Sequence, residues 1–200
     1  MEKTIPFTVY AESTPNPTTM KFVANRLLLE SGLAEYSNLE EAKGSPLATE
    51  LFRFPFVTGV FIQDNFITVM KSDMVPWEDV VMELREFVRT FLNDGREVVT
   101  NLLETAVADQ NLAARETHAE PKSILEERII TILDNEIAPA VARDGGNITF
   151  MNYEKGVLSV ALRGACSGCP SSTITLKNGI EALLKNRLPG EIEEVVAVNG

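Results

Sequence analysis

The stretch GACSGCPSS, residues 164–172, contains both cysteines of the chain, Cys166 and Cys169, in a CxxC spacing. It follows residues 157–163, whose alternating apolar and polar side chains predict a strand. It precedes a run in which apolar side chains recur at helical spacing. Pro170 marks the start of that helix, because proline needs no backbone donor at the first helical position. The sequence therefore places the CxxC at a strand-to-helix junction.

The same periodicities extend outward from this junction. A long amphipathic helix is expected from Ser123, where a capping-box pattern begins, with a local disturbance at Pro139. Strands at 147–153 and 157–163 flank a short turn, and EEVVAV at 193–198 reads as a last strand. Residues 123–200 are thus predicted to form an α-β-β-α-β domain.

The first half of the chain predicts a second small domain. Apolar alternation, helical periodicity and turn residues predict strands at 5–12, 20–24, 26–30, 57–63 and 65–71 and helices at 45–54, 76–93 and 97–103. Residues 106–122 are polar, lack periodicity and contain a proline, which is typical of a linker. We therefore expect an α+β protein with two small domains, 1–105 and 123–200, joined by the linker 106–122.

The composition is that of an ordinary globular protein, with 44% hydrophobic and 24% charged residues. No apolar run approaches the roughly 20 residues of a membrane span. The opening MEKTIPFTVYAEST has no apolar core segment and is not Arg-rich, so a cytoplasmic protein is expected. The net charge is −11, without a basic cluster interleaved with aromatics, which argues against nucleic acid as a partner.

The cysteines are the candidate metal ligands. Cys169 is expected at or beside the helix N-cap, where free N–H groups and the helix dipole should lower the thiol pKa. CxxC spacing serves zinc, iron–sulfur clusters and dithiol redox chemistry alike, and two buried cysteines can also occur by chance. Zinc sites and clusters normally need four protein donors. The chain has two thiols and one histidine, His118, which we interpret as a solvated linker residue. Two copies of the chain would supply four sulfurs at a shared interface.

The sequence also resembles a known family. Residues 123–200 resemble the NifU-like C-terminal domain of the Nfu proteins through RDGG (143–146), LRGACSGCPSS (162–172) and TLKNGIE (175–181). Residues 10–90 resemble the Nfu N-terminal domain through TPNP (14–17), MKF (20–22), SPLA (45–48) and FITV (66–69).

The resemblance implies a role for both cysteines. It implies a [4Fe-4S] cluster, and so iron, bound between two subunits by Cys166 and Cys169. It further implies that upstream assembly proteins supply the cluster and that apo iron–sulfur proteins accept it. The expected protein is a carrier that is a homodimer when loaded, and not an enzyme.

Two other functions are weighed against a carrier. One is a thioredoxin-like oxidoreductase with Cys166 as the attacking thiol, although the expected strand order lacks the βαβ context of that fold. The other is a structural zinc module that cross-links a permanent dimer. Four further features are interpreted as mainly structural: the helix-stopping turn Asp144-Gly145-Gly146, Trp77 at a helix start, and the solvated helix residues Lys177 and Asn178.

Overall fold

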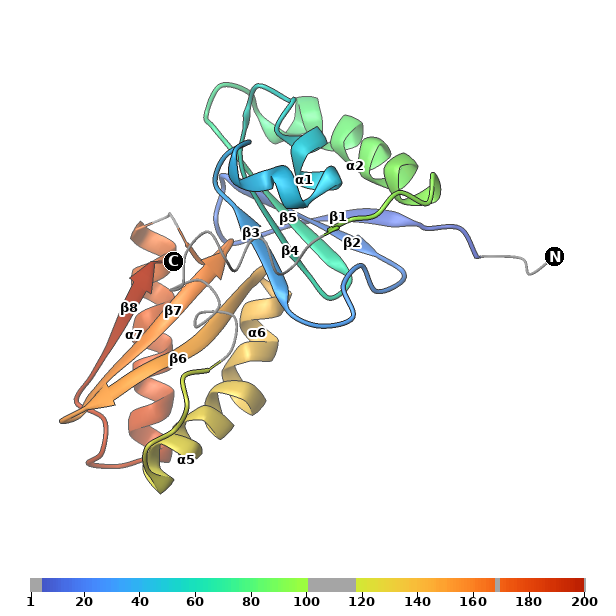
Figure 1. Ribbon diagram of the computed structural model, residues 1–200. Helices are drawn as coiled ribbons and strands as arrows, with labels where there is room; N and C mark the ends of the chain where they lie inside the picture. The colour runs from blue at the N-terminus through green and yellow to red at the C-terminus, as the bar shows by residue number, and fades with distance from the viewer. Residues whose placement is uncertain (1–4, 101–117, 168–169, 200) are drawn as a thin grey trace. The chain divides into compact units, whose positions relative to one another are not determined.

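A computed structural model describes residues 5–100, 118–167 and 170–199. The chain divides into two compact units, Met1–Ala108 and Asp109–Gly200. Each unit has its own sheet and its own apolar core (Figure 1). Helices and strands occur in both, which confirms the α+β class. Most of the predicted linker, 106–117, lies outside the described residues.

The first unit is built on an antiparallel five-stranded sheet in the order β1-β2-β5-β4-β3. Along the chain its elements are β1 Val9–Ser13, β2 Thr19–Ala24, β3 Leu33–Tyr36, the 3₁₀ helix η1 Glu41–Gly44, α1 Pro46–Leu51, β4 Val57–Gln63, β5 Phe66–Lys71 and α2 Trp77–Asn93. Helices α1 and α2 lie over one face of the sheet (Figure 1). The core between them contains Phe22, Ile67 and Leu84, each with no exposed surface.

Local sequence signals account for most of this unit. Ser45 caps α1, since its hydroxyl accepts a hydrogen bond from the Ala48 N–H at 3.1 Å. Two expectations were wrong, because residues 26–30 form no strand and residues 97–100 form no helix. The short strand β3 was not anticipated. The last segment is instead tied to η1, because the Thr100 N–H and hydroxyl both donate to the carbonyl of Gly44.

The second unit has the predicted α-β-β-α-β order, with the first helix in three parts. Its elements are α5 Ile124–Ile132, the π-helical turn η2 Leu133–Ile137, α6 Ala138–Arg143, β6 Gly146–Glu154, β7 Val157–Gly164, α7 Pro170–Arg187 and β8 Glu194–Asn199. Ser123 is the N-cap of α5 and accepts the Glu126 N–H at 3.2 Å. The π turn precedes Pro139, which lacks the N–H that would bond four residues back. The predicted disturbance is therefore confirmed and has a defined form.

The sheet of this unit has β7 at its centre. Strand β6 pairs with β7 antiparallel, and β8 pairs with β7 parallel after the crossover through α7. The β6–β7 turn contains Lys155 and Gly156, both with positive φ, as the tight hairpin turn requires. Alternate residues of β6 and β7 pack against the helices, including Phe150 and Leu162, and Leu184 of α7 completes this core.

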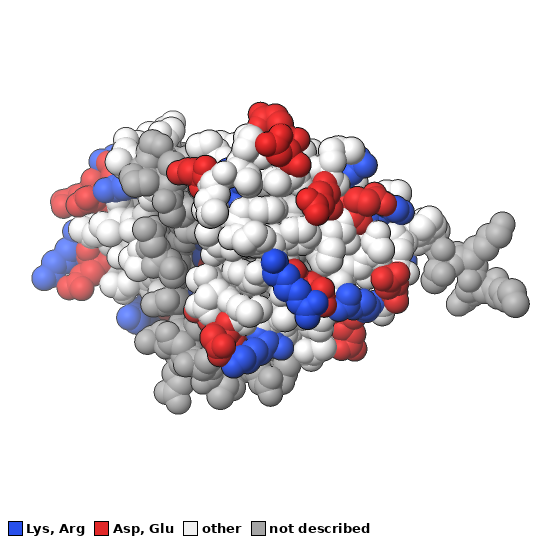
Figure 2. Space-filling view, turned by 90° about the horizontal axis from the view of Figure 1, so that it is seen from above, with Lys and Arg blue, Asp and Glu red and all other residues white. Residues whose placement is uncertain are grey.

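Charges of both signs are mixed on the face shown in Figure 2. Figure 2 shows Lys and Arg side chains interspersed with Asp and Glu on the face that it displays, without a wide basic patch among the described residues. No helix within the described part of the chain combines the length and apolar character that a membrane span needs.

Candidate functional site

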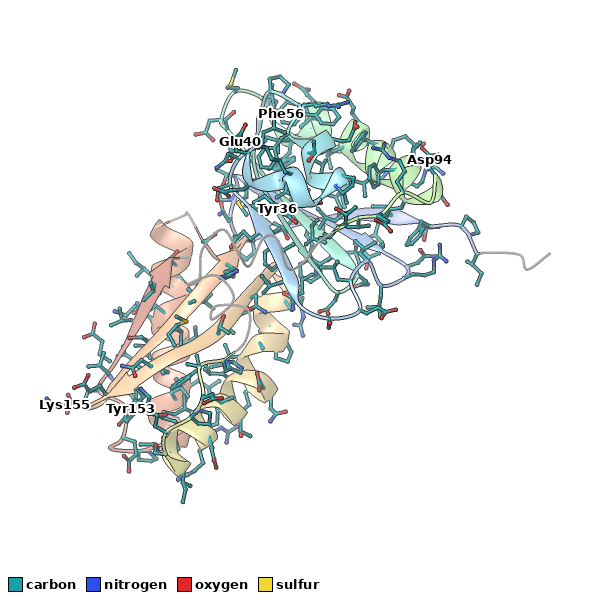
Figure 3. All side chains as sticks on the ribbon, in the orientation of Figure 1. Tyr36, Glu40, Phe56, Asp94, Tyr153 and Lys155 are labelled. Atoms are coloured by element: carbon teal, nitrogen blue, oxygen red, sulfur yellow. The ribbon has the colours of Figure 1, made fainter. Side chains whose placement is uncertain are left out.

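Cys166 lies in the turn that connects β7 to α7. Its side chain is buried, with 7% relative exposure, and its thiol is free. The hairpin turn near Tyr153 and Lys155, labelled in Figure 3, forms the other end of the β6–β7 pair. Cys169 lies outside the described residues, so the expectation for its helix-cap environment remains a prediction.

Hydrogen bonds from both sides hold the turn around Cys166. The Ser167 N–H and hydroxyl both donate to the carbonyl of Gly164, at 3.1 and 2.8 Å. Gly164 has φ of +63°, a left-handed conformation that glycine adopts without strain. The Thr173 hydroxyl donates to the carbonyl of Cys166 at 3.1 Å. The cysteine backbone is thus fixed both to the end of β7 and to the first turns of α7.

The turn Asp144-Gly145-Gly146 forms the opposite wall of the site. The Gly145 carbonyl accepts the Ala165 N–H at 3.1 Å. A Cβ placed on Gly146 would lie 2.6 Å from Cys166 Sγ. This turn ends α6, as expected, but it also makes room for the sulfur. Sequence reasoning assigned it mainly the first role, because the proximity of Gly146 to Cys166 depends on the pairing of β6 with β7.

Burial and a nearby carboxylate both affect the pKa of the Cys166 thiol. Burial raises the pKa of the Cys166 thiol to about 12, and the negative charge of Asp144 adds to the rise. A lowered thiol pKa was expected for Cys169 at the helix N-terminus, whereas Cys166 packs into the core of its unit. Cys166 therefore holds its proton in the metal-free protein, and a metal must displace that proton in order to bind.

His118 is placed differently from the prediction. Its Nδ1 accepts the Phe150 N–H at 2.8 Å, and its Nε2 lies 2.7 Å from Asp134 Oδ1. The side chain is only 21% exposed, so it is not a solvated linker residue. Its polar neighbours in sequence could not reveal partners 16 and 32 residues away.

Lys177 and Trp77, which were interpreted as mainly structural, both make contacts within their units. Lys177 pairs with Glu194 of β8 at 3.1 Å, while Asn178 is exposed. The Trp77 ring N–H donates to the carbonyl of Pro17 at 2.9 Å, which fixes the TPNP segment to the start of α2. Within the described residues, no three His, Cys, Asp or Glu side chains group as a metal site.

Comparison with known proteins places the chain in a family. Residues 9–95 match the family model described as "Scaffold protein Nfu/NifU N terminal", and residues 129–196 match the "NifU-like domain". The chain belongs to the Nfu family. This confirms the resemblance drawn from its motifs.

Several relatives in the Nfu family are similar over most of the chain. It is 36% identical over 178 residues to NifU-like protein 4, mitochondrial, of Arabidopsis thaliana, covering 88% of the chain and 61% of the relative. It is 36% identical over 191 residues to the NFU1 iron-sulfur cluster scaffold homolog, mitochondrial, of Drosophila sechellia, covering 95% and 64%. For the human protein of that name the identity is 34% over 191 residues, covering 95% and 71%. The chain thus spans less than two thirds of the plant and fly relatives.

The expected cytoplasmic location is contradicted by these comparisons, because the relatives are named as mitochondrial proteins. The expectation relied on the opening segment of the Nfu chain, which is neither apolar nor Arg-rich. The cellular location of a protein is specified by short targeting segments that the fold does not need. The sequence pattern of the folded domains therefore carries no information about location.

Proposed function

We propose that this protein is an iron–sulfur cluster carrier in which two copies hold one [4Fe-4S] cluster through Cys166 and Cys169. The cluster is cargo, and apo iron–sulfur proteins receive it. Membership of the Nfu family supports this function, as do relatives named as iron-sulfur cluster scaffold homologs. The observation that carries the proposal is the free Cys166 thiol, held between β7 and α7 three residues ahead of Cys169.

The number of thiols supports a shared site. The chain has two cysteines, and a cluster of this kind normally takes four thiolates. A twofold pair of chains supplies Cys166 and Cys169 twice, so the cluster would join the two copies. Such a cluster lies between subunits, where the thiolates of an acceptor protein can replace the ligands of the carrier one at a time.

The dithiol oxidoreductase is disfavoured by the state of Cys166. The attacking cysteine of such an enzyme needs a low pKa and access to its substrate. Cys166 has the opposite properties, since it is buried and its thiol pKa is raised to about 12. We therefore propose a carrier and not an enzyme.

We propose that the first unit selects the acceptor proteins. Its core is separate from that of the second unit, so it is suited to contact other proteins independently of the CxxC. Deletion of residues 1–105 should leave cluster binding intact and change the rate of transfer to at least some apo-proteins. Equal transfer rates to every acceptor tested would remove this role.

Anaerobic reconstitution of the full chain tests the function. Iron, sulfide and native mass are measured on one sample, and we expect about four iron and four sulfide per two chains. Cys166→Ser and Cys169→Ser should each abolish the visible absorbance of the cluster. Asn178→Ala is the control, because it changes an exposed polar side chain of α7 away from the turn that holds Cys166.

Three results would exclude the proposal. A cluster on a strictly monomeric chain would contradict the shared site. A full complement of iron in either cysteine variant would contradict the ligand assignment. Bound zinc, without iron or visible absorbance after oxygen-free purification, would identify the structural zinc module instead.

A further inference from the structure

His118 joins three separate parts of the second unit. Its ring nitrogens contact the backbone of Phe150 on β6 and the carboxylate of Asp134 on η2. The next residue, Ala119, donates its N–H to the Phe150 carbonyl at 2.9 Å. Residues 118 and 119 therefore occupy both backbone hydrogen-bonding groups of Phe150.

This contact resembles the addition of a short strand to β6, with one substitution. In a regular ladder a backbone carbonyl would accept the Phe150 N–H. Here the His118 ring nitrogen accepts it, at 2.8 Å. The register of β6 against β7 shifts directly afterwards, between Phe150 and Asn152. The pairing at this edge thus depends on a side chain that can take up a proton.

The hydrogen bonds determine the state of the ring. A backbone N–H can only donate, so Nδ1 of His118 must be unprotonated. The neutral ring then carries its proton on Nε2 and donates it to Asp134 Oδ1, at 2.7 Å. A second proton would create an N–H at Nδ1 that faces the Phe150 N–H. Two donors cannot bond to each other, so the contact with β6 would be lost while the contact with Asp134 remained.

We propose that His118 is a proton-operated clasp, which holds residues 118–119 on the edge of β6 when the ring is neutral and releases them when it is protonated. The facing groups are the Asp134 carboxylate from η2 and the Phe150 peptide from β6, with Glu120 and Lys122 nearby on the same segment. Histidine is the side chain that ordinarily changes charge between about pH 5 and 8.

Release changes the start of the second unit. The Lys122 N–H is separately bonded to the Glu126 carboxylate, so the segment stays anchored at the α5 cap. The His118 ring stays bonded to Asp134 on η2, so release detaches residues 118 and 119 from β6 while both ends of the segment remain held. Release also exposes the N–H and carbonyl of Phe150 on the outer edge of β6. This inference does not depend on a metal at Cys166.

Nuclear magnetic resonance of the full chain tests the clasp. With ¹⁵N-labelled histidine at pH 7.5, the single His118 ring should show an unprotonated Nδ1 and a protonated Nε2. Amide hydrogen exchange, corrected for intrinsic rates, is then followed from pH 8 to pH 5. Protection of the Phe150 and Ala119 amides should fall at least tenfold in step with ring titration, while the Leu162 amide of the central strand stays protected. A proton on Nδ1 at pH 7.5, or unchanged protection across the titration, would overturn the proposal.

Two variants separate the ring from other titrating groups. His118→Ala should leave the Phe150 amide weakly protected at both ends of the pH range, and wild-type protection at pH 8 would refute the clasp. His118→Gln cannot titrate, so its protection at pH 8 should persist at pH 5. A fall equal to that of the wild type would assign the transition to another group and refute the role of His118.

Discussion

Gly146→Ala tests whether the wall of the Cys166 site is as tight as the structure indicates. The added Cβ would lie 2.6 Å from both Cys166 Sγ and the Arg163 carbonyl oxygen. Heavy atoms in contact normally stand about 3.5–4.0 Å apart, so the neighbours must move by about an ångström. Overpacking of this kind typically costs about 1–3 kcal/mol. For a unit of this size, that lowers the unfolding temperature by roughly 5–20 °C.

Differential scanning calorimetry of the full chain measures this shift, with Gly179→Ala as the control. Gly179 is exposed within α7 and has no atom within 4 Å of an added Cβ. Alanine favours a helix over glycine by roughly 0.5–1 kcal/mol, so this variant should unfold at a higher temperature. Both positions lie in the second unit, so they should move the same transition in opposite directions. Our account of the site is refuted if Gly146→Ala unfolds at or above the temperature of the wild type.

Three further predictions concern the thiol and the first unit. In the metal-free Cys169→Ser variant at pH 8, iodoacetamide should modify Cys166 at least tenfold more slowly than in the same chain unfolded by guanidinium. The reason is that the folded thiol is buried and its pKa is raised. Equal rates in the folded and unfolded chains would contradict the buried site. Because the folded-state pKa of Cys166 is raised from 9.0 to about 12, its contribution to stability is fully present below about pH 9 and is lost as the pH rises toward 12. Urea unfolding between pH 8 and 11 should therefore show a weaker pH dependence in Cys166→Ala than in the wild type, and identical slopes would exclude this linkage. Ser45→Ala should lower the free energy of unfolding by about 1–2 kcal/mol in urea titrations. The buried hydroxyl accepts a hydrogen bond from the Ala48 N–H and donates one to the Val98 carbonyl at 2.6 Å. A loss below about 0.5 kcal/mol would show that neither hydrogen bond contributes to stability.

Sequence reasoning succeeded where a structural signal is local. The caps at Ser45 and Ser123 and the break around Pro139 depend on side chains within a few residues, so they were predicted correctly. Helical and strand periodicity in residues 123–200 likewise established the order of elements around the CxxC. The short strand β3 was not anticipated, because four residues carry too little alternation to be distinguished from a loop.

Features of the site that depend on distant partners could not be predicted in this way. The contact between Gly146 and Cys166 requires β6 and β7 to pair in one register. The burial of Cys166, which raises the pKa of its thiol, depends on core residues from several elements. The role of His118 likewise arises from partners on η2 and β6. Each depends on tertiary contacts that no window of sequence contains.

The π turn η2 affects the position of the turn that borders Cys166, because that turn follows α6 directly. A π turn accommodates one more residue than the α-helical spiral would at the same rise, and each α-helical residue advances the spiral by about 100°. Winding Leu133–Ile137 as a regular α-helix with the same number of residues would rotate α6 about its axis by that angle. Val141 would then leave the core, and Gly146 would no longer reach the cysteine sulfur. The widened turn η2 thus sets the rotation of α6 relative to α5, and with it the position of β6 beside the Cys166 thiol.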